Sequence, residues 1–177
     1  FPVASYNWSL NSVRQAFYLF TFKKSSDLKG YLRYLSLYTS WVRGIEGDLR
    51  DQLVRGIVLP REAIALSTKV IRAELISPDQ SPYFISADRL GGFEAVEALR
   101  FQDRVKVVIE KQVNPAVQSL LSFLDGDYLK GAPEQVGLWQ YPGGREYYRQ
   151  LIRSFVGFDL SPESVHEYGL AEVRRLE

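Results

Sequence analysis

The stretch DLKGYLRYLSLYTSWVRGIEGDLRDQL, residues 27–53, decides the fold. Its apolar residues recur at about every third or fourth position, the spacing that places side chains on one face of an α-helix. That face is formed by Leu28, Tyr31, Leu32, Leu35, Tyr38, Val42, Ile45, Leu49 and Leu53. Gly30, Gly44 and Gly47 either weaken the helix, by up to about 1 kcal/mol each relative to alanine, or permit close approach of another helix. We predict a long amphipathic core helix near 27–55.

Capping residues and further periodic segments extend this pattern to the whole chain. Ser26 or Asp27 can cap the long helix, Gly56 is a natural stop, and Pro60 suits the first turn of a new helix. Other helices are predicted over Ser9–Phe22, 93–124, 144–156 and 162–175, the last one capped by Ser161. No alternating strand pattern is present. The sequence predicts an all-α, irregular bundle of about six helices in a single domain over 1–177.

Three segments interrupt the helices and need separate interpretations. Pro115 either kinks one continuous helix or opens a new helix capped by Asn114, and the unbroken apolar phase favours the kink. The long loop 77–92 contains Pro82-Tyr83-Phe84-Ile85, which is too apolar for a free linker, so we expect it to pack onto the helices. Asp125-Gly126-Asp127 is interpreted as a helix-ending turn, followed by a connecting loop over 126–143.

Composition excludes several classes of function. The 22 Lys and Arg residues balance 21 Asp and Glu, which gives a formal net charge of +1 and no support for nucleic-acid binding. No apolar run approaches the roughly 20 residues that cross a bilayer, so no transmembrane segment is expected. The chain has no Cys and one His, too few ligands for a zinc site of its own. Met is absent even at position 1, so we expect a fragment of a longer protein.

Aromatic residues, glycines and the single histidine gather in residues 137–170. Gly143-Gly144 before a helix could present backbone N–H groups to an anion, or could simply form a tight turn. His166-Glu167 begins like the H-E-x-x-H zinc helix, but position 170 is Leu170, so the second imidazole is missing. No Ser-His-Asp set can be argued either. The residues alone therefore predict no catalytic group in this chain.

The same region resembles a large bacterial family, the domain of unknown function 885. The family pattern reads Gly-Leu, then Pro-x-Gly-x-x-x-Tyr, then Thr-Pro-Glu-Glu-Ile-His-x-x-Gly-Leu-x-Glu-Val. The corresponding segments here are Gly137-Leu138, Pro142 to Tyr148 and Leu160 to Val173. Ser161 and Ser164 replace the family's Thr and Glu, which affects only helix capping. The segments 56–61 and 113–116 also resemble family motifs, so the likeness extends from about Phe22 onward.

The resemblance implies a helical zinc metallopeptidase related to carboxypeptidases. In that family the zinc-binding segment follows well downstream of the His-x-x-Gly-Leu motif, so zinc is expected in the full-length protein and no metal or other cofactor in this fragment. The 177 residues would be its N-terminal portion. By the same resemblance Gly144, Tyr147 and His166 are the candidate substrate-contact residues.

We therefore expect a non-catalytic helical scaffold that forms one wall of a peptide-substrate cleft. Its partner would be the missing C-terminal catalytic region, and the truncated face near 137–170 could pair with itself. The alternative is a helical module that binds a protein or peptide without enzymatic activity. If the reading frame ends at Glu177, the alternative is favoured. The family includes secreted lipoproteins, which suggests the cell envelope, although no residue of the chain specifies a compartment.

Overall fold

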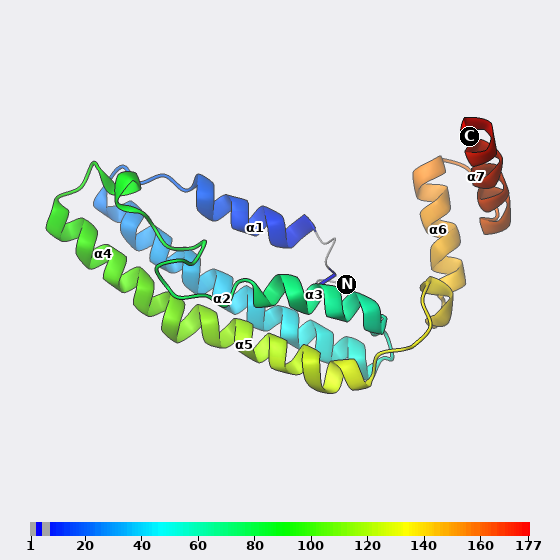
Figure 1. The fold of residues 1–177 in the computed structure, drawn as a ribbon, viewed down its shortest axis with the longest axis horizontal. Helices are drawn as coiled ribbons and strands as arrows, with labels where there is room; N and C mark the ends of the chain where they lie inside the picture. The colour runs from blue at the N-terminus through cyan, green and yellow to red at the C-terminus, as the bar shows by residue number, and fades with distance from the viewer. Residues whose placement is uncertain (1–2, 5–7) are drawn as a thin grey trace. The chain divides into compact units, whose positions relative to one another are not determined.

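The fold was analysed in a computed structural model that describes the backbone of residues 3–4 and 8–177 and the side chains of 3–4 and 12–177. The chain forms two compact units, 1–133 and 134–177, and each unit is described by itself (Figure 1). The expectation of a single domain over 1–177 stays a prediction.

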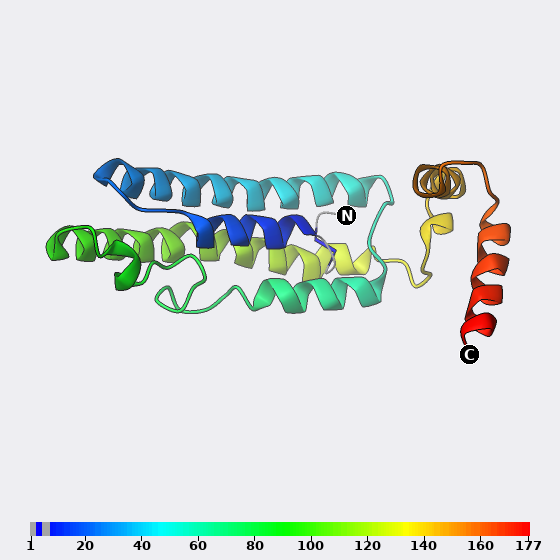
Figure 2. The ribbon, with the colours of Figure 1, turned by 90° about the horizontal axis from the view of Figure 1, so that it is seen from above.

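Unit 1 is built on two long helical segments that lie side by side (Figure 2). The first is α2, Ser25–Val54. The second runs through α4 (Ala95–Val108), η2 (Ile109–Val113), α5 (Asn114–Phe123) and η3 (Leu124–Tyr128). Helix α2 packs against both α4 and α5. Eight residues of α2 are buried, and all but Thr39 belong to the apolar face predicted from the sequence: Leu28, Tyr31, Leu35, Tyr38, Thr39, Val42, Ile45 and Leu49. The predicted core helix is therefore confirmed.

The ends of α2 follow from local hydrogen bonds. The N-cap of α2 is Lys24, so the prediction of Ser26 or Asp27 as the cap was wrong. Asp27 lies in the first turn, and its carboxylate accepts the backbone N–H groups of Lys23 at 2.8 Å and Lys24 at 3.0 Å. Gly56 follows the helix with a φ of 69°, a left-handed conformation that suits glycine. Gly44 and Gly47 face open space rather than another backbone. Of the two interpretations of these two glycines, close helix approach is therefore not realised.

Pro115 lies inside the second helical segment, which runs without a break from α4 through η2 and α5 to η3 and is called the rod below. Proline has no N–H for the carbonyl four residues back, and its ring collides with that carbonyl in a regular helix. The preceding η2 is a π-helical turn, in which Asn114 donates its N–H to the carbonyl of Ile109, five residues back. The wider π-helical turn confines the missing hydrogen bond and the displaced carbonyl to a short segment, as π-helical turns within α-helices do. The continuous helix favoured by the apolar phase is the one observed.

The rod ends later than the sequence predicted. Asp125-Gly126-Asp127 lies inside η3, a second π-helical segment, and Gly126 alone has non-helical angles there (φ −98°, ψ −108°). Tyr128 is fully buried and its hydroxyl accepts the N–H of Leu59 at 3.2 Å. This tertiary bond and the burial of Leu124 hold the extra turns. The predicted connecting loop over 126–143 was therefore too long.

Two shorter helices and the long loop complete unit 1. Helix α3, Arg61–Arg72, packs against α5, and α1, Trp8–Leu19, buries Phe17 among the rings of Tyr31, Tyr34, Tyr38 and Tyr83. The loop contains one short 3-10 helix, η1, Ala87–Leu90. Tyr83 and Ile85 are buried, so the loop packs onto the helices as expected.

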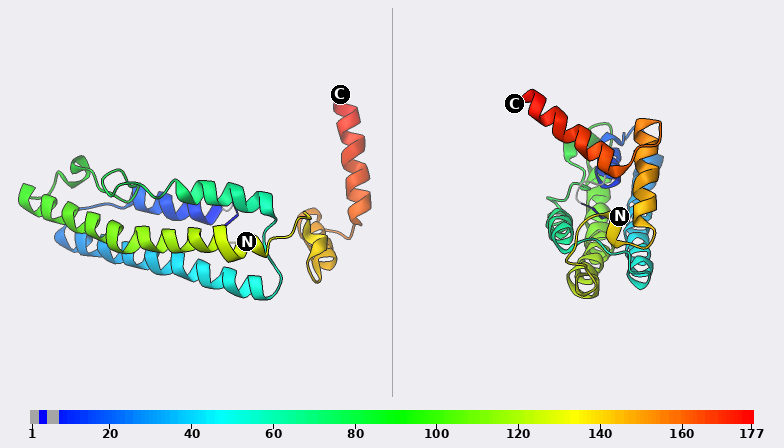
Figure 3. Two further views of the ribbon diagram at one scale, coloured as in Figure 1. Left: turned by 60° about the horizontal axis from the view of Figure 1, so that its bottom comes forward. Right: turned by 90° about the vertical axis from the view of Figure 1, so that its right-hand side faces the viewer.

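Unit 2 contains η4 (Leu138–Gln140), α6 (Gly144–Val156) and α7 (Pro162–Leu176), shown in Figure 3. The boundaries predicted for both α-helices agree with the structure. Gly157 ends α6 with a φ of 89°. Ser161 caps α7, and its hydroxyl accepts the N–H of Ser164 at 3.0 Å. Gly144 and Ile152 are buried in α6, whereas α7 has no buried residue.

The all-α fold class is confirmed for the residues that the structure describes, which include no strand. Among those residues no helix is both long and apolar enough to span a bilayer.

Candidate functional site

The turn that precedes α6 in unit 2 begins with a glycine, Gly137, that makes room for a tryptophan. Gly137 has a φ of 97°, which L-residues with side chains rarely adopt. A Cβ atom at Gly137 would lie 2.8 Å from the indole Nε1 of Trp139. The absence of a side chain at Gly137 therefore lets the Trp139 ring fold back over the turn.

A pair of glycines, Gly143 and Gly144, joins this turn to α6. Gly143 is left-handed, with a φ of 71°, and leads directly into the helix. At Gly144 a Cβ atom would overlap the backbone carbonyl of Leu138, so only glycine fits. The N–H of Gly144 donates to the carbonyl of Tyr141 at 2.9 Å. Helix α6 thus starts in direct backbone contact with the turn.

A pocket of about 560 Å³ opens within unit 2. Its size is in the range of pockets that hold small organic ligands. Residues of the turn, α6 and the start of α7 line it: Gly137, Leu138, Trp139, Arg145, Tyr148, Arg149, Pro162 and Glu163. Two aromatic rings, two guanidinium groups and one carboxylate therefore surround one space.

The charges of the pocket are arranged by helix geometry. Arg145 and Arg149 are four residues apart in α6, so their side chains lie on one face. Glu163 lies in the first turn of α7, where its own backbone N–H, the Ser161 hydroxyl and the two arginines hold its pKa below the usual value. Arg149 is 4.0 Å from Glu146, the limit of an ion pair, and no ion pair of Arg145 occurs among the described residues. The pocket carries a formal charge of +1, from two arginines and one glutamate.

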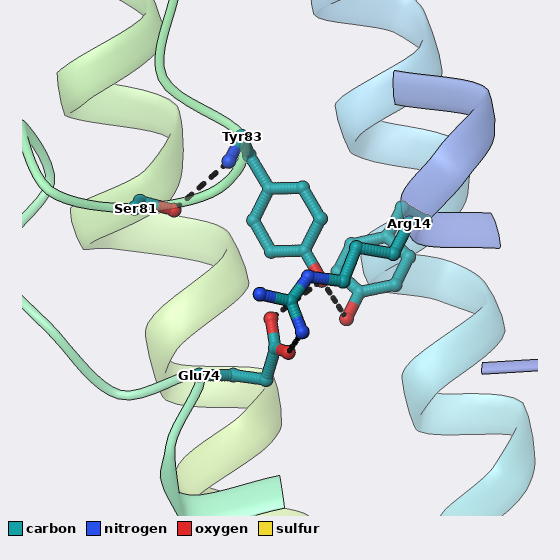
Figure 4. Close-up of polar contacts among 5 residues, drawn as sticks. Arg14, Glu74, Ser81 and Tyr83 are labelled. Carbon is teal, nitrogen blue, oxygen red and sulfur yellow. Dashed lines mark hydrogen bonds and ion pairs between the residues drawn. The ribbon is translucent and has the colours of Figure 1, made fainter. Parts of the chain in front are cut away.

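Unit 1 holds the other notable polar cluster (Figure 4). The hydroxyl of Tyr83 lies 2.7 Å from that of Tyr38 and donates to the carboxylate of Glu74 at 2.9 Å. Arg14 forms an ion pair with Glu74 at 3.3 Å. Burial is the largest cause that raises the pKa of both phenols, in Tyr38 to about 12. The Tyr31 hydroxyl also donates to the Tyr83 carbonyl at 2.7 Å.

This cluster stabilises the loop rather than forming a reactive site. Both phenols keep their protons at neutral pH, because their pKa values are raised, and the space beside them is only about 50 Å³. Both phenol hydroxyls and both carboxylate oxygens of Glu74 have protein partners, which is the usual condition for burial. The cluster connects three elements to the loop at Tyr83: α1, α2 and the turn that follows α3 (Figure 4).

Comparison with known families gives a match over the complete sequence. A family model described as "Bacterial protein of unknown function (DUF885)" matches residues 1–177. The chain belongs to this family. The resemblance seen in the motifs of 137–173 is thereby confirmed, while its metallopeptidase description stays a prediction.

A solved structure with the same fold as the DUF885 chain was found by comparison. It is "The crystal structure of the putative lipoprotein from Colwellia psychrerythraea", with a TM-score of 0.89 at 20% sequence identity. The alignment covers 99% of this chain and 31% of the Colwellia chain, so the DUF885 chain spans about a third of that protein's length. At this identity the likeness demonstrates the fold alone. The comparison with curated proteins found no match.

The three candidate residues of the DUF885 motifs have different environments. Gly144 is buried. A side chain at this position would overlap the Leu138 carbonyl, and the Gly144 N–H donates to the carbonyl of Tyr141. Tyr147, on α6, is 54% exposed, and His166, on α7, is also exposed. None of the three is among the described residues that line the pocket. Their role in substrate contact stays a prediction.

The pocket residues were not singled out from the sequence. The tyrosine of the family pattern, four residues after its glycine, falls at Tyr148, and Tyr148 lines the pocket whereas Tyr147 does not. Counting along the motif could have found it. The spacing of Arg145 and Arg149 was visible too, but two arginines on a helix face are ordinarily solvent-exposed charges. Their approach to Glu163 depends on how α6 and α7 pack.

The described residues contain no group of three or more His, Cys, Asp or Glu side chains that could hold a metal ion. With one His and no Cys in the sequence, this donor set does not fit the zinc site that the family resemblance implies.

Proposed function

We propose that this chain is the non-catalytic, N-terminal helical part of a zinc metallopeptidase-like protein. Unit 1 serves as a scaffold, and unit 2 contributes one wall of the cleft in which a peptide substrate is bound. The zinc ligands belong to residues outside the 177, since the chain contains one His and no Cys. No chemical step is assigned to the residues of this chain.

The observation that carries this proposal is the exposed apolar surface of unit 2. Twelve large apolar side chains of this unit are exposed: Val136, Trp139, Tyr147, Tyr148, Phe155, Val156, Phe158, Leu160, Tyr168, Leu170, Val173 and Leu176. Extended apolar surfaces of soluble proteins commonly mark interfaces. The Colwellia protein is about three times as long, which supports a further region of polypeptide as the partner.

Two exposed side chains of unit 2 are suited to a role in the cleft wall. Tyr147 has a phenol and His166 an imidazole, and each can donate a hydrogen bond to a substrate carbonyl or to a developing oxyanion. Both are exposed. Gly144 contributes by position, because it lets α6 begin against the turn.

The proposal is tested with two proteins, the 177-residue chain and the product of the complete reading frame. We expect the longer protein to hold about one zinc per chain by metal analysis and to cleave peptides, and the 177-residue chain to do neither. Stoichiometric zinc in the 177-residue chain would contradict the proposal. So would a complete reading frame without a downstream zinc motif.

A binding module without enzymatic activity is the second candidate, favoured by the exposed aromatic residues around the pocket of unit 2. The two candidates separate in the same experiment. A complete protein that binds peptides tightly, contains no zinc and cleaves nothing would support the binding module. Sedimentation of the 177-residue chain adds a check, because self-association through unit 2 is expected if its apolar surface lacks its natural partner.

A further inference from the structure

The pocket of unit 2 combines a positive charge with aromatic walls. Arg145 and Arg149 present planar guanidinium groups that can each donate two parallel hydrogen bonds to a carboxylate. Trp139 and Tyr148 supply rings that can pack on an apolar group. Among the described residues, neither arginine has a carboxylate at close range: Arg149 is 4.0 Å from Glu146, and no ion pair of Arg145 occurs.

We propose that this pocket binds a small organic carboxylate that carries an aromatic or apolar group. The carboxylate pairs with Arg145 and Arg149, and the apolar group lies against Trp139 and Tyr148. A free acid and the C-terminal end of a peptide share this chemistry. The site goes beyond the proposed function, because it binds such a ligand whether or not the longer protein cleaves peptides.

The sign of the pocket's charge selects the ligand. Two arginines against one glutamate leave one positive charge without compensation. The Glu163 carboxylate is already held by its own backbone N–H and by the Ser161 hydroxyl, so it does not need the arginines as hydrogen-bond donors. It repels every anion to some extent, so the preference over phosphate and acetate comes from the apolar group of the ligand, which lies against Trp139 and Tyr148.

The glycines of the turn preorganise the aromatic wall. Gly137 leaves the space that the Trp139 indole occupies, and Gly144 holds the start of α6, and with it Arg145, against the Leu138 carbonyl. The two glycines therefore connect the aromatic and the cationic sides of the pocket within a single turn. Preorganised groups lose less entropy on binding.

The test uses calorimetric titration of the protein expressed from its complete reading frame. The probes are N-acetylphenylalanine, its amide, a short peptide ending in phenylalanine with a free or an amidated end, acetate and inorganic phosphate. We expect the free acids to bind and the amides not to bind. Arg145→Gln and Arg149→Gln should each weaken binding about tenfold or more. Glu163→Gln should strengthen it by up to about fivefold.

Arg153→Gln is the matched control. Arg153 lies on the same helix but outside the pocket, 3.8 Å from Asp159, and its loss should leave the affinity unchanged. Equal binding of acid and amide would overturn the proposal, as would a wild-type protein that binds none of the acids. An equal loss in all three arginine variants, or phosphate and acetate binding as tightly as N-acetylphenylalanine, would also overturn it. Circular dichroism of each variant verifies that it is folded. Tighter binding of the peptide acid than of N-acetylphenylalanine would identify a peptide end as the natural source, and the reverse a free acid, both in support of the site.

Discussion

The two units are made of the same kind of helix but differ in what the helices bury. The main buried apolar cluster extends from Val3 to Ala132 and lies entirely within unit 1. In unit 2, α7 has no buried residue, and Phe155 of α6 is 85% exposed. Local signals start and stop helices in both units equally well. Burial of their apolar faces is extensive in unit 1, whereas Ile152 is the one large apolar residue of unit 2 that is buried among the described residues.

The difference teaches that helix formation and core formation are separate events. Helices of 13 and 15 residues, the lengths of α6 and α7, are marginal in water without tertiary packing. Unit 1 supplies that packing through α2 and the α4–α5 rod. The stability of α6 and α7 in unit 2 depends far more on helix caps, on tight turns and on a partner that covers the apolar surface.

The largest expected contrast comes from truncating one leucine in each unit. Leu121→Ala in unit 1 should lower the free energy of unfolding by about 2–5 kcal/mol, because Leu121 is fully buried and leaves a cavity. Leu170→Ala in unit 2 should change it by less than about 0.5 kcal/mol, because Leu170 is exposed. Urea unfolding followed by circular dichroism measures both. A large effect of Leu170→Ala would break the comparison.

A glycine substitution examines the turn that builds unit 2. Gly144→Ala places a methyl group on the Leu138 carbonyl and should destabilise α6 by about 1–3 kcal/mol. Gly169→Ala is the control, since that position of α7 has open space around it and alanine should stabilise the helix by about 0.5–1 kcal/mol. Amide hydrogen exchange of α6 and α7 reports each effect. Unchanged exchange in Gly144→Ala would show that the turn tolerates a side chain.

The buried polar cluster of unit 1 provides a contrast with an exposed tyrosine. Tyr83→Phe removes the hydroxyl that meets Glu74 and Tyr38 and should cost about 1–3 kcal/mol, because their buried polar atoms lose a partner. Tyr147→Phe in unit 2 should be nearly neutral, since Tyr147 is exposed. Thermal unfolding of both variants gives the comparison. Equal melting temperatures would mean that the cluster adds nothing to stability.

The ionisation of Tyr38 has the smallest expected effect on stability, and it can be measured only at alkaline pH. Burial raises the pKa of Tyr38 from 10.0 to about 12, so the folded chain keeps a proton that the unfolded chain loses above pH 10. The unfolded state then binds fewer protons, and the free energy of unfolding falls as pH rises from about 10 to 12. Below pH 10 this contribution is fully present and constant. Unfolding titrations across that range test it, and Tyr38→Phe should flatten the decrease.

Much of the fold was predictable because its signals are local. The spacing of apolar residues over 28–53 predicts the buried face of α2. The boundaries of α6 and α7 follow from Gly143-Gly144, Gly157 and Ser161-Pro162. The end of the α4–α5 rod was not predictable, because η3 is held by the burial of Tyr128 against a segment 69 residues away. A composition-based interpretation of Asp125-Gly126-Asp127 cannot detect such a contact.

The candidate site was predictable only in part. The family motif pointed to the correct turn and to both helices, because glycine, proline and tyrosine occur there at fixed spacing. Counting along the motif places its tyrosine at Tyr148, which lines the pocket, and not at Tyr147, the residue that we singled out. Tyr147 and Tyr148 are adjacent, and their directions differ by about 100° on a helix, so only one of them faces the pocket.

The sequence by itself therefore determined the helices, their caps and the family, because these depend on residues close together in the chain. The tertiary structure alone decided two features: where the rod ends, and which charges share the pocket of unit 2. Each of these depends on contacts between segments that are separate in sequence. The approach of Arg145 and Arg149 to Glu163 exists only once α6 and α7 are folded together.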